Sequence, residues 1–301
     1  MNMKKSVISL SGLLVCLNLS GCNLPTQNEN DPLPKGISDN TTGDVSQAEH
    51  FTSVPVNSLK ELSAENSNRV ALVIGNGDYK KQPLSNPIYD AQDMSNSLNQ
   101  LGFSVIQVLN ADKATMDQAI QKFQNDLSND KVGLLYYSGH GVQYKSKNDM
   151  SKNYMIPIEA MLAIKEPNDL NANAVSVNDV LSMMEKKATN QLNIVILDAC
   201  RNNPFFKGDN KKNGLAPMSS AEGLLIAYAT SPNKVALTSK ERNSPYTKHL
   251  LNYMVQDLPI EIMLKRVRVA VKNETNGEQT PWYAASFDGD FQFATAAVIQ
   301  Y

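Results

Sequence analysis

Short apolar runs alternate with amphipathic stretches over most of this chain, beginning near Arg69. Runs of this length that are apolar at successive positions are typical of strands buried on both faces, as in a parallel sheet. We predict six such strands, at residues 70–74, 103–109, 132–137, 192–197, 223–230 and 291–294. The last is the shortest of the six.

The stretches between these runs show helical spacing. Apolar residues recur every three or four positions in the first two, at Ile88, Ala91, Met94, Leu98 and Leu101, and then at Met116, Ile120, Phe123 and Leu127. Asn86 is expected to cap the first helix, with Pro87 at its first position and Gly102 at its end. Similar start signals at Ser176 and Ser244 predict two further helices, and residues 259–273 form another amphipathic segment.

Strands that alternate with helices of this length predict an α/β fold with a mostly parallel, six-stranded sheet and helices on both faces. About 230 residues take part, which is enough to bury a full core. We expect the domain to cover residues 67–296. Its large portion would span about 67–204 and its small portion about 222–296, with an exposed polar loop over 201–222 between them.

The first 22 residues are typical of an export signal. Lys4 and Lys5 precede an apolar stretch over residues 7–19 that is too short to span a bilayer. The ending Leu19-Ser-Gly-Cys22 resembles the lipobox of bacterial lipoproteins, which implies that Cys22 is acylated. By the sorting rule of that family, Asn23 implies the periplasmic face of the outer membrane. The alternative is a plain signal peptide that contains Cys22 by chance.

Residues 23–66 are rich in Asn, Ser, Thr, Asp and Pro and poor in large apolar residues. This composition predicts a disordered tether between a lipid anchor and the domain, with a short helix over 59–64 as a possible interruption.

The composition narrows the classes of function. The 301 residues are 42% hydrophobic and 19% charged, which is ordinary for a globular protein, and the formal net charge of -2 argues against a nucleic-acid partner. Three cysteines are too few for a disulfide framework. If Cys16 is removed with the signal and Cys22 is acylated, Cys200 is the one thiol left.

Two reactive residues follow two of the predicted central strands. His140 lies just past the strand at 132–137, and Cys200 lies just past the strand at 192–197. Ligands of open α/β sheets bind at the carboxyl ends of the strands, and a Cys with a His supplies a thiol nucleophile and its base. Taken singly, Cys200 is more often a buried structural residue and His140 a turn residue. Of the other histidines, His50 lies in the tether and His249 in a predicted helix.

The glycines beside His140 fit this chemistry. Gly139 and Gly141 carry no side chain, so a peptide backbone can approach closely. The backbone N–H groups of Gly141 and Cys200 are candidate donors to an oxyanion, which typically contribute about 3 kcal/mol each to transition-state stabilisation.

Several sequence blocks resemble the caspase-like cysteine peptidases. The central ones are Tyr137-Ser-Gly-His-Gly141 and Asp198-Ala-Cys-Arg201, and others lie at residues 71–76, 86–90, 228–231 and 243–247. The caspase signature has a His about 50 residues before a Gln-Ala-Cys motif, whereas here the spacing is 60 and Asp198 replaces the Gln. These departures resemble the paracaspases, metacaspases and bacterial caspase-like proteins more than true caspases.

The resemblance runs from Arg69 to about residue 293, and it implies a caspase-like three-layer αβα sandwich and cysteine endopeptidase activity. It implies that Cys200 attacks the scissile carbonyl and that His140 is the general base or acid, with no third triad member identifiable. In paracaspases and metacaspases, acidic residues line the S1 pocket, and Asp90 and Asp198 match two of them.

A buried pair of carboxylates also favours a cationic partner on physical grounds, so we expect cleavage after Arg or Lys. The alternatives are that Asp90 lies on a polar helix face and that Asp198 is a polar strand end. A third acidic residue found in some relatives is not evident over residues 232–237.

No cofactor or metal is predicted. The spacing of an EF-hand is absent, so dependence on Ca²⁺, which some metacaspases show, has no support in the sequence. The expected partners are a polypeptide substrate and, through the anchor, a membrane; the oligomeric state is left open. Two other readings stay open: a catalytically silent caspase-like scaffold on the cell envelope, and a thiol hydrolase that is not a peptidase.

Overall fold

The computed structural model describes residues 54–65, 67–127, 132–145, 151–186, 192–199, 205, 214–218, 222–232 and 234–294. Within these ranges one sheet has seven strands in the order β1-β3-β2-β4-β8-β9-β10. Their bounds are β1 Ser58–Leu62, β2 Arg69–Gly75, β3 Ser104–Leu109, β4 Val132–Ser138, β8 Leu192–Asp198, β9 Leu224–Tyr228 and β10 Trp282–Ser286. The five inner strands are parallel, and the two edge strands, β1 and β10, are antiparallel.

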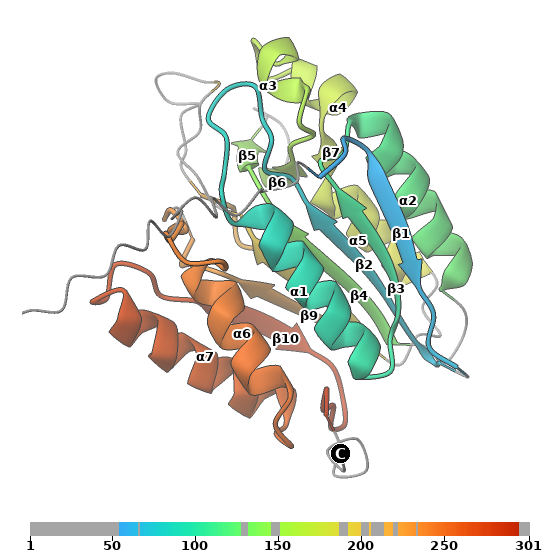
Figure 1. Ribbon diagram of the computed structural model, residues 1–301, viewed down its shortest axis with the longest axis vertical. Helices are drawn as coiled ribbons and strands as arrows, with labels where there is room; N and C mark the ends of the chain where they lie inside the picture. Colours follow the sequence, from blue (N-terminus) through green and yellow to red (C-terminus); the bar gives the residue numbers. More distant parts are fainter. Residues whose placement is uncertain are drawn as a thin grey trace, which may run out of the picture. The chain divides into compact units, whose positions relative to one another are not determined.

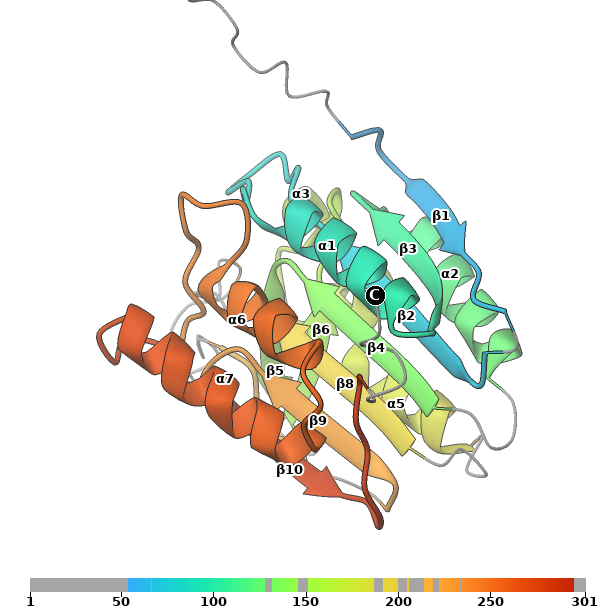
Figure 2. The same ribbon diagram turned by 60° about the horizontal axis from the view of Figure 1, so that its bottom comes forward.

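Helices cover both faces of this sheet (Figures 1 and 2). One face carries α1 (Pro87–Gln100), α6 (Pro245–Met254) and α7 (Ile260–Glu274), and the other carries α2 (Lys113–Asp126) and α5 (Val177–Lys186). The predicted three-layer α/β architecture with a mostly parallel sheet is therefore confirmed.

A small second sheet lies beyond the carboxyl end of β4. It consists of β5 (Gly141–Lys145), β6 (Ser151–Met155) and β7 (Val175–Ser176), all antiparallel. Two short helices, α3 (Ala160–Ala163) and α4 (Asp169–Asn173), connect β6 to β7. The side chains of this region form their own hydrophobic cluster. The sequence did not predict these elements, because they are too short to show a clear period.

The core explains why the central strands lack polar alternation. All seven residues of β4 and all seven of β8 are buried, since helices cover both faces. The helix α1 lies so close to β2 that a Cβ atom on Gly75 would stand 2.4 Å from the carbonyl oxygen of Pro87. Glycine at this position therefore permits α1, which carries Asp90, to pack against the sheet.

The predicted tether extends too far toward the domain. Residues of β1 fall inside the range 23–66, and they form a strand in place of the short helix that the sequence suggests over 59–64. Ser58 to Leu62 pair with Leu109 to Val105 in antiparallel register. The error has a physical cause: an edge strand with one side exposed needs few apolar residues, and Leu59 and Leu62 gave too weak a pattern.

The predicted last strand at residues 291–294 is also wrong. Around Gln292 there is only an isolated bridge to Pro259. Phe291 and Phe293 are nevertheless buried: the guanidinium of Arg69 lies over the Phe291 ring, and the Phe293 ring packs against Phe291. The same guanidinium donates a 2.8 Å hydrogen bond to the carbonyl of Phe293. The sixth predicted strand is thus replaced by β10, and β1 is added, so the sheet has seven described strands instead of six.

The helix signals are mostly confirmed. Ser244 accepts from the N–H of Thr247 at the start of α6, and Ser176 accepts from the N–H of Asp179 at the start of α5. Gly102 follows α1 with φ +83°. Asn86, however, is not a capping side chain, because its amide contacts another loop instead.

The predicted signal peptide, Cys22 and most of the tether lie outside the described residues, as does nearly all of the loop at 201–222. Among the helices of the described part, none has the length and apolar character needed to cross a bilayer.

Candidate active site

The two strands that precede His140 and Cys200 are neighbours. β4 and β8 pair in parallel, and the last pair in the register joins Ser138 to Asp198. Each partner stands two residues before its reactive residue. The pairing continues one step further, because the N–H of Gly139 donates to the carbonyl of Asp198 at 3.5 Å. Cys200 itself lies outside the described residues.

The turn after β4 lies against the residue before Cys200. A Cβ atom on Gly141 would stand 3.1 Å from the Cβ of Ala199 and 3.1 Å from a methyl group of Leu215. The missing side chain of Gly141 therefore lets this turn approach the end of β8.

The imidazole of His140 is buried and oriented. Its Nε2 lies 2.7 Å from the carbonyl oxygen of Gln82, and its ring packs against the ring of Tyr79 with centroids 4.4 Å apart. A carbonyl oxygen can only accept, so Nε2 carries the proton and the lone pair of the neutral ring is on Nδ1. Gln82 has φ +55°, a left-handed conformation that turns its carbonyl toward the imidazole.

Two tyrosines fix the backbone of His140. The hydroxyl of Tyr137 donates to the His140 carbonyl at 2.7 Å, and the His140 N–H donates to the hydroxyl of Tyr79 at 3.0 Å. The two hydroxyls lie 3.2 Å apart. A Cβ on Gly139 would come within 2.6 Å and 2.8 Å of these oxygens, so this glycine is needed for the network to form.

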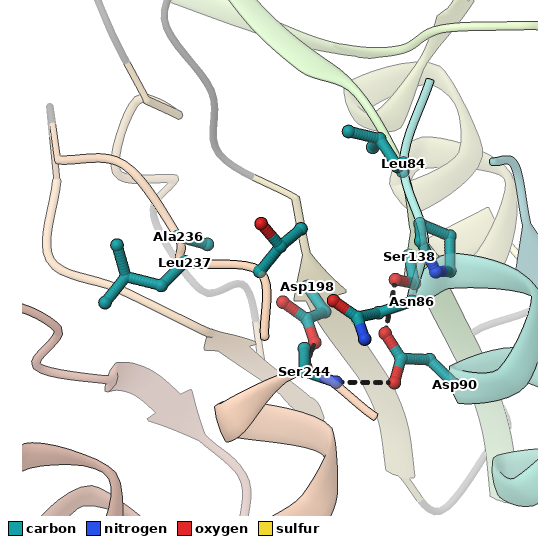
Figure 3. A pocket seen from close by; sticks show the side chains of 11 residues that line it. Leu84, Asn86, Asp90, Ser138, Asp198, Ala236, Leu237 and Ser244 are labelled. Atoms are coloured by element: carbon teal, nitrogen blue, oxygen red, sulfur yellow. Dashed lines mark hydrogen bonds between the residues drawn. The ribbon is translucent and has the colours of Figure 1, made fainter. Parts of the chain in front are cut away.

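A small pocket lies beside this turn, and the two predicted S1 residues line it. Asp90 comes from α1 and Asp198 from the end of β8, and their exposed fractions are 0% and 6%. Figure 3 shows both side chains converging on Ser244, at the start of α6. The other lining residues are Leu84, Asn86, Pro87, Ser138, Gly139, Ala236, Leu237 and Thr238.

Hydroxyl and amide groups hold each carboxylate. Asp90 accepts from the Ser138 hydroxyl and from the Ser244 N–H, both at 3.0 Å. Asp198 accepts from the Ser244 hydroxyl and, at 2.7 Å, from the hydroxyl of Thr247. Since the hydroxyl proton of Thr247 points to Asp198, the Tyr136 hydroxyl donates to Thr247 at 2.6 Å.

The surroundings of Asp90 disfavour its ionisation. Burial, and then the nearby charge of Asp198, raise the pKa of Asp90 well above its ordinary value, although the hydrogen bonds from Ser244 and Ser138 oppose this. A cation placed between the two carboxylates would offset both causes. The pocket is therefore suited to a guanidinium or ammonium group.

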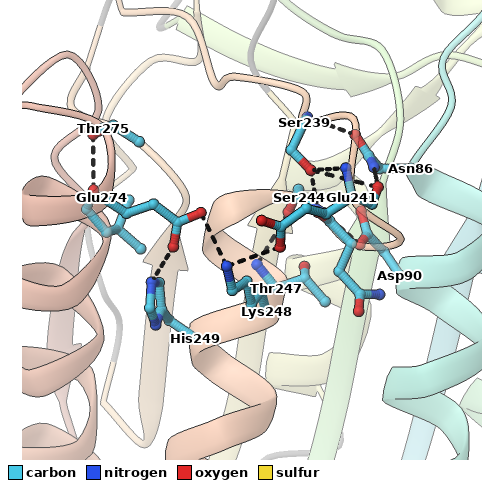
Figure 4. Close-up of polar contacts among 12 residues, drawn as sticks. Asn86, Asp90, Ser239, Glu241, Ser244, Thr247, Lys248, His249, Glu274 and Thr275 are labelled. Carbon is cyan, nitrogen blue, oxygen red and sulfur yellow. Dashed lines mark hydrogen bonds and ion pairs between the residues drawn. The ribbon is translucent and has the colours of Figure 1, made fainter. Parts of the chain in front are cut away.

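One wall of the pocket is a loop that α1 holds in place (Figure 4). The buried amide of Asn86 donates to the carbonyls of Glu241 and Arg242 and accepts from the N–H of Ser239. Two turns later, Asp93 makes a two-pronged ion pair with Arg242, with both distances 2.8 Å. The helix that supplies Asp90 thus also positions the opposite wall.

The sequence found the main polar residues of this region but not their supports. The structure brings Asp90 and Asp198 to one pocket. His140 lies at the same edge of the sheet as this pocket, and Cys200 lies outside the described residues. Ser244 and Thr247 lie in a block that carried the family resemblance, so that signal was present. The Gln82 carbonyl had no signal, because any residue type supplies a backbone carbonyl.

Among the described residues that line the pocket, the acids are Asp90 and Asp198, and the segment at Ala236–Thr238 adds no third one. Among the described residues, no group of three His, Cys, Asp or Glu side chains is arranged to hold a metal ion.

Comparison with known families gives one match that covers most of the chain. The family profile described as "Caspase domain" matches residues 68–292. This range includes every element from β2 to β10, and with it both candidate catalytic residues.

Two curated proteins are similar to this chain. The human "Mucosa-associated lymphoid tissue lymphoma translocation protein 1" is 29% identical over 204 residues, which cover 66% of this chain and 23% of the human protein. Its mouse homolog is 28% identical over 252 residues, which cover 80% of this chain and 29% of the mouse protein. The chain therefore spans only about a quarter of the length of these relatives.

Two solved structures have a similar fold. Caspase-1 from Spodoptera frugiperda superposes with a TM-score of 0.54 at 13% identity, covering 77% of this chain and 92% of the insect protein. A protein of Geobacter sulfurreducens superposes with a TM-score of 0.53 at 16% identity, covering 74% of this chain and 94% of that one. At these identities the similarity concerns the fold.

The carboxyl pair predicts a pH-dependent effect of Asp90→Asn on stability. Because the pKa of Asp90 is raised in the folded state, the folded protein binds a proton more tightly at this residue than the unfolded chain does. Asp90 therefore lowers the free energy of unfolding as pH rises above the pKa that the residue has in the unfolded chain. Asn cannot ionise. We therefore expect the melting temperature of the variant, relative to wild type, to increase as pH rises above about 4, the ordinary pKa of Asp.

The control is Asp288→Asn, at an exposed position, which should leave this difference flat. A difference for Asp90→Asn that is constant or that shrinks with pH would show that burial and the Asp198 charge do not act on Asp90 as described.

Proposed function

Because the chain belongs to the caspase domain family, we propose that it is an active cysteine endopeptidase in which Cys200 is the nucleophile and His140 is the acid–base partner. The observation that carries this proposal is the register of β4 and β8, which joins Ser138 to Asp198 two residues before each reactive side chain. The activity of the longer relatives is not assumed for this chain, which spans about a quarter of their length.

The hydrogen bond between Nε2 of His140 and the Gln82 carbonyl supports Nδ1 as the nitrogen that would transfer the proton. In the first step Nδ1 takes the thiol proton, and the Cys200 thiolate attacks the scissile carbonyl. The imidazolium then gives this proton to the leaving amine as the C–N bond breaks. Water, activated by the same nitrogen, hydrolyses the acyl-enzyme and restores the thiol.

The backbone N–H groups of Gly141 and Cys200 are the proposed oxyanion donors. Gly141 and Met155 face each other in the register of β5 and β6. The backbone hydrogen bond beside them runs from the Ile156 N–H to the His140 carbonyl, so Gly141 and Met155 form a non-hydrogen-bonded pair. The N–H of such a residue points away from the partner strand, so it is available to a ligand. A donor of this kind contributes about 3 kcal/mol to transition-state stabilisation.

The substrate residue before the cleaved bond is proposed to be Arg or Lys. Two buried carboxyl groups held by hydroxyl groups line the pocket, and burial and the charge of Asp198 raise the pKa of Asp90. A guanidinium between the two acids would offset both causes and favour the ionised form of each. An Asp side chain would instead add a third carboxyl to the pocket.

The alternative function is a catalytically silent caspase-like module that binds partners on the cell envelope. The raised pKa of Asp90 does not distinguish the two, since a binding pocket and a specificity pocket both use buried charge. The oriented imidazole of His140 favours the peptidase, because a scaffold has no need for a single histidine tautomer.

We expect an acyloxymethyl ketone probe that carries Arg to label the full chain covalently at Cys200. Cys200→Ala should abolish the labelling, and His140→Ala should reduce it by about a hundredfold, since general acid–base catalysis contributes 10²–10⁴-fold. Intact mass spectrometry reads the adduct. Wild-type protein that stays unmodified while a reference cysteine peptidase is labelled would favour the scaffold.

For the specificity, we expect fluorogenic peptides ending in Arg to be cleaved far faster than matched peptides ending in Asp. Asp90→Asn should lower kcat/KM for the Arg peptide by at least about thirtyfold, because removing one partner of a buried charge pair costs 2–5 kcal/mol. Asp288→Asn, an exposed change of the same kind, should have no effect. A preference for the Asp peptide would contradict the assignment of Asp90 and Asp198.

We also propose that the protein is anchored to the cell envelope through an acylated Cys22, on the resemblance of residues 19–22 to a lipobox. Metabolic labelling with an alkyne fatty acid should tag the wild-type chain and not Cys22→Ser. Equal tagging of both, or release of wild-type protein into the soluble periplasmic fraction, would contradict the anchor.

A further inference from the structure

A second cleft, separate from the Asp90–Asp198 pocket, lies where α6, α7 and β10 meet. It is a shallow, narrow cleft, and its lining residues are Tyr246, Leu264, Arg268, Pro281, Trp282 and Tyr283. None of these residues lines the first pocket. The family match and the proposed peptidase activity give this cleft no role.

Three hydrogen-bond donors of the cleft have no partner. They are the hydroxyl of Tyr246, the Nε–H of Arg268 and the indole N–H of Trp282, and all three atoms are buried. Buried donors are normally paired, because an unpaired one loses its hydration without compensation. Here three of them come from three different elements to one cleft, which indicates that an acceptor from outside the chain belongs there.

The chemistry of these groups defines that acceptor. An indole N–H and a guanidinium only donate, and the guanidinium is cationic. Burial raises the pKa of Tyr246, which is 1% exposed, so its phenol stays protonated and also donates. A complementary ligand therefore carries negative charge and acceptor oxygens and needs no donor of its own.

The remaining walls of the cleft are apolar. Leu264, Pro281 and the ring of Tyr283 contribute no charge. A carboxylate on a short aliphatic stem matches both parts, since the carboxylate meets the donors and the stem meets these walls. A phosphate lacks such a stem and would leave the apolar walls uncovered.

We propose that the cleft between α6, α7 and β10 binds a carboxylate on a short aliphatic stem, such as an acidic side chain of a polypeptide or a free dicarboxylate. Part of the site is already in place. The Trp282 ring stacks on Tyr228 with centroids 4.7 Å apart and planes 3° apart, and Tyr246 is fixed on the first turn of α6. Arg268 is half-buried and lies over the ring of Tyr283, and the proposal requires its side chain to shift when the ligand enters.

Trp282 is the only tryptophan of the 301 residues, so tryptophan fluorescence of the full chain reports on this cleft. The probes are the blocked peptide Ac-Ala-Glu-Ala-amide, free glutarate and, as the uncharged control, Ac-Ala-Gln-Ala-amide. We expect a saturable change with the Glu peptide and none with the Gln peptide. If glutarate binds as tightly as the Glu peptide, free dicarboxylates are ligands; if the peptide binds more tightly, acidic side chains of polypeptides are preferred.

Two variants test the donors directly. Tyr246→Phe removes a hydroxyl that has no partner in the free protein, so its melting temperature should equal or exceed that of wild type, while binding of the Glu peptide weakens by about tenfold or more. Arg268→Gln should weaken binding similarly. Lys265→Gln, an exposed change on the same helix outside the cleft, should keep wild-type affinity.

Three results would overturn the proposal: no saturable change with either carboxylate, equal binding of the Gln peptide or of inorganic phosphate, or wild-type affinity in a folded Tyr246→Phe variant. The fluorescence test does not depend on peptidase activity, so its outcome is independent of the proposed function.

Discussion

The backbone pairing of β4 with β8 is the constraint on which the candidate site depends. It is a parallel register without a bulge, from Val132 with Leu192 to Ser138 with Asp198. Side chains that follow two such strands must emerge at the same edge of the sheet. The ends of these two strands also set the position of Asp198. They bring the turn at His140 so close to its neighbours that Gly139 and Gly141 have no room for side chains.

The helix α1 supplies one carboxyl of the pocket and holds the loop on the opposite side. Gly75 lets this helix lie close to β2, and the first turns of the helix then bring Asp90 to the pocket while Asn86 and Asp93 hold the opposite loop. Burying a second carboxyl beside Asp198 disfavours its charged form. A carboxyl of this kind does not stabilise the free protein, so ligand binding is the expected reason for its presence.

The sequence was informative where burial imposes a long, regular pattern. The five inner strands, the helices of the two layers and the caps at Ser176 and Ser244 were read correctly because each is a local signal several residues long. The edge strands β1 and β10 were missed, since a strand that is paired on one side needs little apolar character. The role of the Gln82 carbonyl and the contacts of Asn86 depend on tertiary packing, and no local pattern encodes them.

The missed strand β1 fixes the point at which the preceding chain enters the domain. Ser58, Leu109, Gly75, Ser138 and Asp198 occupy one row across the sheet. Four strand spacings of about 4.8 Å place this entry roughly 20 Å from Asp198, at the same edge of the sheet as the site. A fusion partner or a surface attached through the residues before Ser58 would therefore lie nearest to this edge of the sheet, and a linker at that end would have to leave the pocket mouth open.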